Sequence, residues 1–219
     1  MSSWTVPAIG GAIAIGAIVF GGVAMIQSQP DKVLARREAS WGARIQAGDV
    51  VLQDLACGLR CNLVRDVTHS RYTQVGVVLE KDGKREVWES FGPVSAVPLE
   101  NWIDRGKEGR VAIYRPKQVD VAALDAAVRA NAGKPDDPDF SWDDRALYAG
   151  ELVEKSFERA GTPLVAPHTL DASALAEHEK GIRGLTHGNL TPQLAVVMPV
   201  DFTRSDKLVR VIDELTEPP

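Results

Sequence analysis

Cysteine and histidine are scarce in this sequence, which has two cysteines and four histidines among 219 residues. The cysteines, Cys57 and Cys61, lie four positions apart, and the histidines are scattered. Cys-x-x-Cys pairs, Cys/His clusters with zinc spacing and the Cys-x-x-Cys-His haem motif are all missing from the sequence. The sequence therefore predicts no metal ion and no cofactor.

A strong charge imbalance is also missing, because 30 acidic residues face 25 basic ones and the formal net charge is −5. The small acidic excess is spread along the chain, so nothing indicates a nucleic-acid partner. Asp136, Asp137 and Asp139 lie close together, but Pro135 and Pro138 interrupt the spacing of a calcium-binding EF-hand. We interpret this stretch as a solvated loop.

Charged side chains of either sign do not occur in residues 1–30. Within this stretch, Val6 to Ile26 is a continuous apolar run of about 20 residues, the length that a helix needs to span the hydrocarbon core. A cleaved signal peptide is the alternative, but it needs a basic start, and Ala24 to Gln27 is a poor cleavage site. We interpret residues 1–30 as a transmembrane anchor whose residues 6–26 contact membrane lipid.

Small residues recur along this anchor at four-residue spacing, at Ala8, Ala12 and Gly16. Such a stripe lets two helices approach closely in lipid, so it indicates a transmembrane helix partner. The alternative is that glycine and alanine are simply common in membrane helices.

The residues after the anchor predict a linker helix over 31–47 and an α+β domain over 48–215, with strands in its first half and helices in its second. An Asp-Gly pair between two β-rich runs is typical of a hairpin. The expected strands are Val50–Leu52, Gln74–Glu80, Arg85–Ser90, Val111–Arg115 and Leu194–Met198. The expected helices are 54–66, 100–105, 120–132, one from Asp143 or Asp144 to about Ala160, 173–180 and a closing helix over 205–215.

Several motifs follow one another in a recognisable order. The sequence around them resembles the permuted papain-like cysteine amidases of the YiiX/YebB-like group, relatives of the NlpC-type cell-wall peptidases, over residues 48–212. The resemblance implies a circularly permuted papain-like fold with a small antiparallel sheet packed on helices. The motifs are Gly48–Leu52, Thr68–Val78, Val87–Val94, Tyr148–Val153 and Val197–Phe202.

The resemblance also implies where catalytic groups would stand. The family's nucleophilic cysteine corresponds to Ala149, its histidine base to Gln74 and its orienting glutamate to Glu89. Alanine has no nucleophilic atom, and a glutamine amide cannot act as a base near pH 7. Losing both groups removes the nucleophilic route. We expect Gln74 and Glu89 to share a hydrogen bond.

The predicted function is a membrane-anchored pseudoenzyme that acts as a binding or accessory subunit of a membrane complex. Its ligand would be a peptide or an acyl-amide, bound by Tyr72, Gln74, Glu89, Tyr148 and Ala149. The alternative is an active envelope cysteine hydrolase of amide bonds that uses a relocated nucleophile such as Cys57.

The cysteines themselves allow two states, a pair of reduced and partly buried thiols or a Cys57–Cys61 disulfide. We expect the reduced pair, because cysteine is among the most buried residue types.

The location follows from two opposing arguments. The family resemblance implies the bacterial inner membrane with the domain on the periplasmic side, which we favour. The basic residues beside the anchor all follow it, which by the positive-inside tendency favours the cytoplasm. These residues are Lys32, Arg36, Arg37 and Arg44.

Overall fold

The computed structural model describes residue 41, residues 44–185 and residues 193–216. The chain divides into two units, residues 1–43 and 44–219, and the named helices and strands belong to the second. The predicted anchor and most of the predicted linker helix lie outside the described residues. Residues 44–47, which the sequence assigns to the linker helix, form a turn and irregular chain. No helix in the described part is long and apolar enough to cross a membrane.

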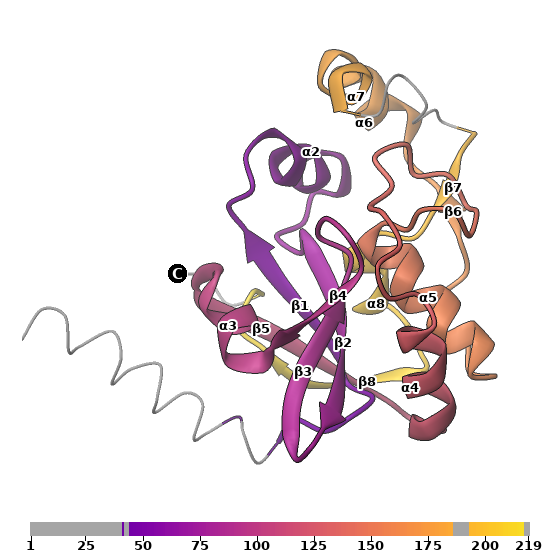
Figure 1. Cartoon of the computed structure of the whole chain (residues 1–219). Helices are drawn as coiled ribbons and strands as arrows, with labels where there is room; N and C mark the ends of the chain where they lie inside the picture. The colour runs from indigo at the N-terminus through magenta and orange to yellow at the C-terminus, as the bar shows by residue number, and fades with distance from the viewer. Residues whose placement is uncertain (1–40, 42–43, 186–192, 217–219) are drawn as a thin grey trace, which may run out of the picture. The chain divides into compact units, whose positions relative to one another are not determined.

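An antiparallel sheet of six strands forms the centre of the second unit (Figure 1). Each strand pairs antiparallel with its neighbour, and helices pack around the sheet, so the predicted α+β class is confirmed. In spatial order the strands are β4 (Ser95–Pro98), β3 (Lys84–Glu89), β2 (Gln74–Lys81), β1 (Val50–Leu55), β5 (Gly106–Pro116) and β8 (Leu208–Asp213).

The hairpin between β2 and β3 turns at Asp82-Gly83. Both residues have positive φ, 53° and 73°, and Lys81 pairs with Lys84 on either side. A two-residue turn with left-handed backbone matches the twist of the two strands. The hairpin predicted from Asp-Gly is therefore confirmed.

The helices form two groups around the sheet (Figure 1). In one, α5 (Ala149–Arg159) packs on β2 and beside α4 (Val121–Arg129). In the other, α2 (Leu59–Thr68) contacts α6 (Ala172–Glu177) and α7 (Glu179–Leu185). The remaining short elements are α3 (Leu99–Asp104), β6 (His168–Thr169), β7 (Ala195–Val196) and α8 (Pro199–Phe202).

The core holds α5 against β2. Alternate residues of β2, Val75, Val77 and Leu79, join one cluster with Leu152 and Phe157 of α5, and all five are 0% exposed. Side chains two apart on a strand share a face, which is why this triplet meets one helix. The contact fixes the first residue of α5 near the first residue of β2.

Two predicted elements near the ends of the domain are wrong. The closing helix expected over 205–215 is instead the strand β8, which pairs with the outer edge of β5. Its Val-Arg-Val-Ile stretch is rich in β-branched residues, which favour strands. The helix expected over 54–66 begins only at Leu59, because Leu55 stays in β1 and pairs with Gly106 of β5.

Two further boundaries differ from the prediction. The helix expected from Asp143 or Asp144 begins at Ala149, because the preceding residues form a loop that is tied to the helix by ion pairs. The strand expected over Leu194–Met198 is limited to the two residues of β7.

Two segments that follow α5 in the sequence dock closely against it. The Val197 carbonyl oxygen would lie 1.9 Å from a Cβ atom placed on Gly150, so only glycine allows this approach. The Glu154 carboxylate accepts hydrogen bonds from the backbone amides of Leu164 and Val165, at 3.0 and 2.9 Å. Burial raises the pKa of Glu154 to about 7, although the two amide hydrogen bonds lower it.

The close approach at Gly150 predicts that Gly150→Ala destabilises the domain by more than about 2 kcal/mol, because a methyl group would collide with backbone. Gly181→Ala in α7 is the matched control, since its new methyl would come no closer than 3.9 Å to another heavy atom. That control should be neutral or slightly stabilising. Urea unfolding of both variants measures the difference, and equal midpoints would contradict the packing described.

The raised pKa of Glu154 predicts a pH effect with a definite sign. Between its unfolded value near 4.5 and about 7, Glu154 binds more proton in the folded state. The free energy of unfolding therefore falls as pH rises through this window, by about 3 kcal/mol for a shift of this size.

Glu154→Gln removes its titration and should make the fall in stability between pH 5 and 8 shallower than in the wild type, while Glu151, whose pKa is also raised to about 7, keeps its own contribution. Glu177→Gln, at an exposed position of α6, is the control and should leave it unchanged. Urea unfolding across this pH range decides, and identical slopes in wild type and Glu154→Gln would show that burial does not perturb this carboxyl.

Candidate functional site

The start of α5 is fixed by the residue before it. Tyr148 is 2% exposed, its hydroxyl accepts a hydrogen bond from the Val197 amide at 3.0 Å, and its ring lies 4.9 Å from that of Phe140. Its side chain does not cap the helix. Ala149 therefore opens α5 in a rigid position, partly exposed, with the first amide groups of the helix free of helical acceptors.

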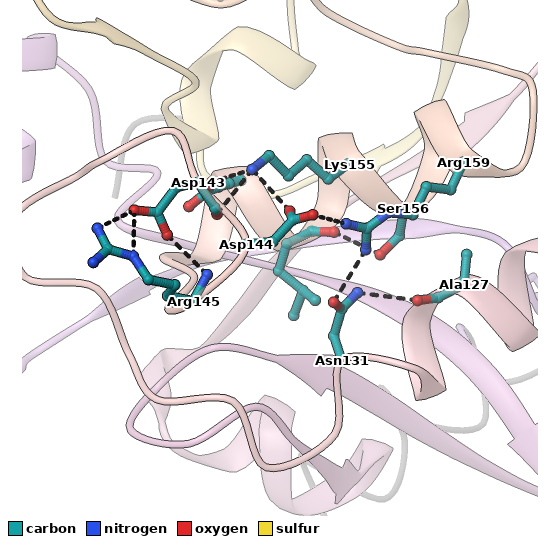
Figure 2. Close-up of polar contacts among 10 residues, drawn as sticks. Ala127, Asn131, Asp143, Asp144, Arg145, Lys155, Ser156 and Arg159 are labelled. Carbon is teal, nitrogen blue, oxygen red and sulfur yellow. Dashed lines mark hydrogen bonds and ion pairs between the residues drawn. The ribbon is translucent and has the colours of Figure 1, made fainter.

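Lys155 ties the preceding loop to α5 (Figure 2). Its ammonium group lies 2.9 Å from the Asp143 carbonyl, 3.1 Å from Asp144 Oδ1 and 2.7 Å from Glu151 Oε1. Two hydrogen bonds and an ion pair with Glu151 surround its charge, which explains how a lysine only 9% exposed is tolerated. Its cation also lies 5.0 Å from the centre of the Trp142 ring.

Arg159 extends this network to α4, the helix that precedes α5 in the sequence (Figure 2). Its guanidinium pairs with Asp144 at 2.8 Å and donates to Asn131 Oδ1 at 3.1 Å. Asn131 in turn donates to the Ala127 carbonyl in α4 at 3.0 Å. The loop before α5 is thus held by both α5 and α4, which immobilises the residues leading to Ala149.

Glu151 is the buried carboxyl of the first turn of α5, 0% exposed. Burial raises its pKa to about 7, opposed by the hydrogen bond to Lys155. Its neighbours are the lysine and the helix backbone, so it acts as a structural carboxyl beneath the helix start.

Gln74 and Glu89 lie side by side, as the sequence predicts. Gln74 Nε2 donates to Glu89 Oε2 at 2.8 Å and to the Ser90 carbonyl at 3.2 Å, so both amide protons are used. The same Glu89 oxygen also accepts from Trp102 Nε1 at 2.9 Å and pairs with Arg105. The carboxylate is 2% exposed and fully paired, so it serves to hold the strand ends and α3 together.

A pocket of about 30 Å³ is lined by residues from both the start of α5 and the start of β2. Gln74, Ala149, Gly150, Arg60 and Ser90 are among the residues that line it. The volume corresponds to about one water molecule. The other lining residues are mostly apolar and include both cysteines: Val64, Phe91, Phe140, Tyr148, Met198, Pro199, Thr73, Cys57 and Cys61.

The predicted binding residues divide into two groups. The structure brings Gln74, Tyr148 and Ala149 together in the lining, with Glu89 directly behind Gln74. Tyr72 does not line this pocket, and its hydroxyl donates instead to Asp213 at 2.5 Å. Burial and that hydrogen bond raise the pKa of Tyr72. Its assignment to the ligand has no support in the geometry.

The cysteines form a disulfide, so the expected pair of reduced thiols is wrong. Cys57 directly precedes α2 and Cys61 lies in its first turn, which brings their Cα atoms to 5.3 Å, within the range that a disulfide needs. Because the chain has only these two cysteines, it has no free thiol in this state. The bond closes a loop of only five residues, worth about 2 kcal/mol in chain entropy.

Sequence reasoning missed the residues that support the site. Arg105 and Trp102 neutralise and bind Glu89, and Lys155 holds the loop before α5, yet each stands in an ordinary helical pattern. The four-residue spacing of the cysteines at a helix start was the one signal for the disulfide.

The comparisons with known proteins agree with this geometry. The family described as "Permuted papain-like amidase enzyme, YaeF/YiiX, C92 family" matches residues 44–212. The uncharacterized protein YiiX of Escherichia coli (strain K12) is 29% identical over 119 residues, which are 52% of this chain and 58% of that relative. This chain therefore spans little more than half the length of that curated relative.

A solved structure is similar to this chain over a larger share of the chain. The crystal structure of metalloprotein yiiX from Escherichia coli O157:H7 has a TM-score of 0.69 and 26% identity, covering 77% of this chain and 97% of that chain. The resemblance seen in the sequence motifs is thereby confirmed. This chain belongs to the permuted papain-like amidase family of YaeF and YiiX.

Proposed function

We propose that this chain is a catalytically silent member of the amidase family that acts by binding. The proposal depends on the chemical groups found at positions 149 and 74, where the family has its nucleophile and its base. The helix start presents the methyl group of Ala149, and the amide of Gln74 donates both its protons to Glu89 and Ser90. Neither group can attack a carbonyl or accept a proton near pH 7.

The alternative, a hydrolase that uses Cys57, requires a thiolate. Cys57 is bonded to Cys61, and a disulfide sulfur is not a nucleophile for an amide. The disulfide therefore supports the proposal that this chain does not catalyse amide hydrolysis.

The pocket keeps groups that suit a peptide or acyl-amide ligand. Ala149 and Gly150 at the start of α5 line it beside the buried Gln74 side chain, and amides in the first turn of a helix lack helical acceptors and can bind carbonyl oxygens. Phe91 and Phe140 supply apolar surface next to them. These features support recognition of an amide group without its cleavage.

A metal ion does not fit the residues present. The E. coli structure is titled a metalloprotein, but in the described part of this chain no three His, Cys, Asp or Glu side chains gather to hold a metal. The site itself offers an amide, a methyl group and two sulfurs bonded to each other. The proposed function therefore involves no metal ion.

The proposed setting is the bacterial inner membrane, with residues 6–26 as a single-pass anchor and the domain on the periplasmic side. The disulfide supports this side, because disulfides persist in oxidising compartments such as the periplasm. The stripe of Ala8, Ala12 and Gly16 supports a transmembrane helix partner in a membrane complex.

The first test is a fluorogenic amidase assay on the purified domain. We expect no turnover above buffer, because neither a nucleophile nor a base is present. Turnover that Cys57→Ala abolishes would overturn the proposal in favour of the cysteine hydrolase.

The second test rebuilds the site in a Cys57→Ser/Cys61→Ser background, so that the introduced thiol is the only one. Ala149→Cys with Gln74→His should react with iodoacetamide at pH 7 at least about 10-fold faster than Ala149→Cys alone, because the imidazole takes the thiol proton. Equal rates would mean that positions 74 and 149 are not the family's catalytic pair.

A further inference from the structure

The pocket is too small for the ligand that the proposed function assigns to it. Its volume of about 30 Å³ suits one water molecule, whereas a site for a small organic ligand has roughly 300 Å³ or more. A binding role therefore requires that one wall moves.

The part of the lining most suited to move is the segment held by the Cys57–Cys61 disulfide. Both Cys57 and Cys61 line the pocket, together with Gln74 and Ala149. Cys57 belongs to the short connection between β1 and α2 and is partly exposed, while Cys61 is 3% exposed inside the helix. The bond thus clamps a surface connection to a buried helix position.

Little else holds that connection in place. In the part of the chain that the structure describes, no backbone hydrogen bond reaches Ala56 or Cys57. Ala56 and Gly58 are exposed, and a Cβ atom placed on Gly58 would meet no heavy atom within 4 Å. Gly58 stays joined to α2, because its carbonyl accepts a hydrogen bond from the Asn62 amide at 3.1 Å, so without the disulfide it is Ala56 and Cys57 that can move outward.

The helix α2, in contrast, is anchored independently of the bond. Leu63, Val64 and Val67 are buried, and two ion pairs, Arg60 with Asp136 and Arg65 with Asp54, tie it to the rest of the domain. Breaking the bond should therefore release the connection and leave the helix in place.

We propose that Cys57–Cys61 is a redox gate on this pocket, closed when oxidised and open to a ligand when reduced. The inference rests on the proposed binding function and adds its regulation. The reductant is a dithiol, and it must reach the partly exposed Cys57 rather than the buried Cys61.

The chemistry is a two-step thiol–disulfide exchange. A thiolate of the dithiol attacks Cys57 Sγ, the protein S–S bond breaks, and Cys61 leaves as a thiolate in the first turn of α2, where free amides favour the anion. The second thiol of the reductant then displaces Cys57 and closes its own disulfide. Two electrons and two protons pass to the protein, which ends with two thiols.

A native side chain reports whether the pocket opens. Met198 lines the pocket and is 2% exposed, and hydrogen peroxide converts methionine to its sulfoxide only where it can reach the sulfur. Oxidation of Met198, followed by peptide mass spectrometry, should be at least about 10-fold faster in Cys57→Ser/Cys61→Ser than in the oxidised wild type. Neither protein has a free thiol to compete for peroxide.

The matched control is Asn62→Ser, an exposed substitution in α2 that keeps the disulfide, and it should oxidise at the wild-type rate. Equal Met198 rates in the serine pair and the wild type would overturn the gate. The proposed function would then still be decided separately by the amidase and alkylation assays.

Hydrogen exchange of the wild-type protein with and without dithiothreitol tests the gate without any substitution. Faster exchange confined to residues 56–58 and the start of α5 supports it. Unchanged exchange overturns it, and so does faster exchange throughout β1 and β2, because the bond would then be a staple of the whole domain.

Discussion

The buried carboxylate of Glu89 is the constraint that organises the site. A carboxylate that is 2% exposed must be paired, and here Trp102, Arg105 and Gln74 donate to a single one of its oxygens. Removing any of these donors would leave a charge poorly paired in the interior. Gln74 therefore has a structural role that does not depend on catalysis: it donates a hydrogen bond to Glu89, as a histidine ring at this position could. What the amide cannot do is accept a proton from a nucleophile.

The opposite side of the pocket is held just as firmly. Lys155 donates hydrogen bonds to the loop before α5 and forms an ion pair with Glu151 in its first turn, and the Val197 carbonyl packs against Gly150. None of these contacts involves the side chain of Ala149. The position of the helix start therefore does not depend on which side chain stands at residue 149.

The sequence was most informative where structure is local or where motifs recur. Asp82-Gly83 predicts its hairpin from turn chemistry alone, and the sequence predicts the helix that ends near Ala160, although its start was placed at Asp143 or Asp144 instead of Ala149. β8 was mistaken for a helix because its apolar residues suit either period, and the edge of β5 that decides the matter is about 100 residues away. Arg105 and Lys155 escaped notice for a similar reason, because their charges acquire meaning only beside Glu89 and Glu151.

The disulfide and the missing nucleophile are linked by chemistry. Cys57, Cys61 and Ala149 line one small pocket. A thiolate at the start of α5 would be activated by the helix and would stand in the same pocket as an S–S bond, where it could attack either sulfur and shuffle the pairing. Alanine at this position removes that competitor. The oxidised pair can then persist, and its state is set by reductants that enter from outside rather than by the site itself. Under the proposed function, alanine at position 149 would therefore also favour a stable disulfide in this pocket.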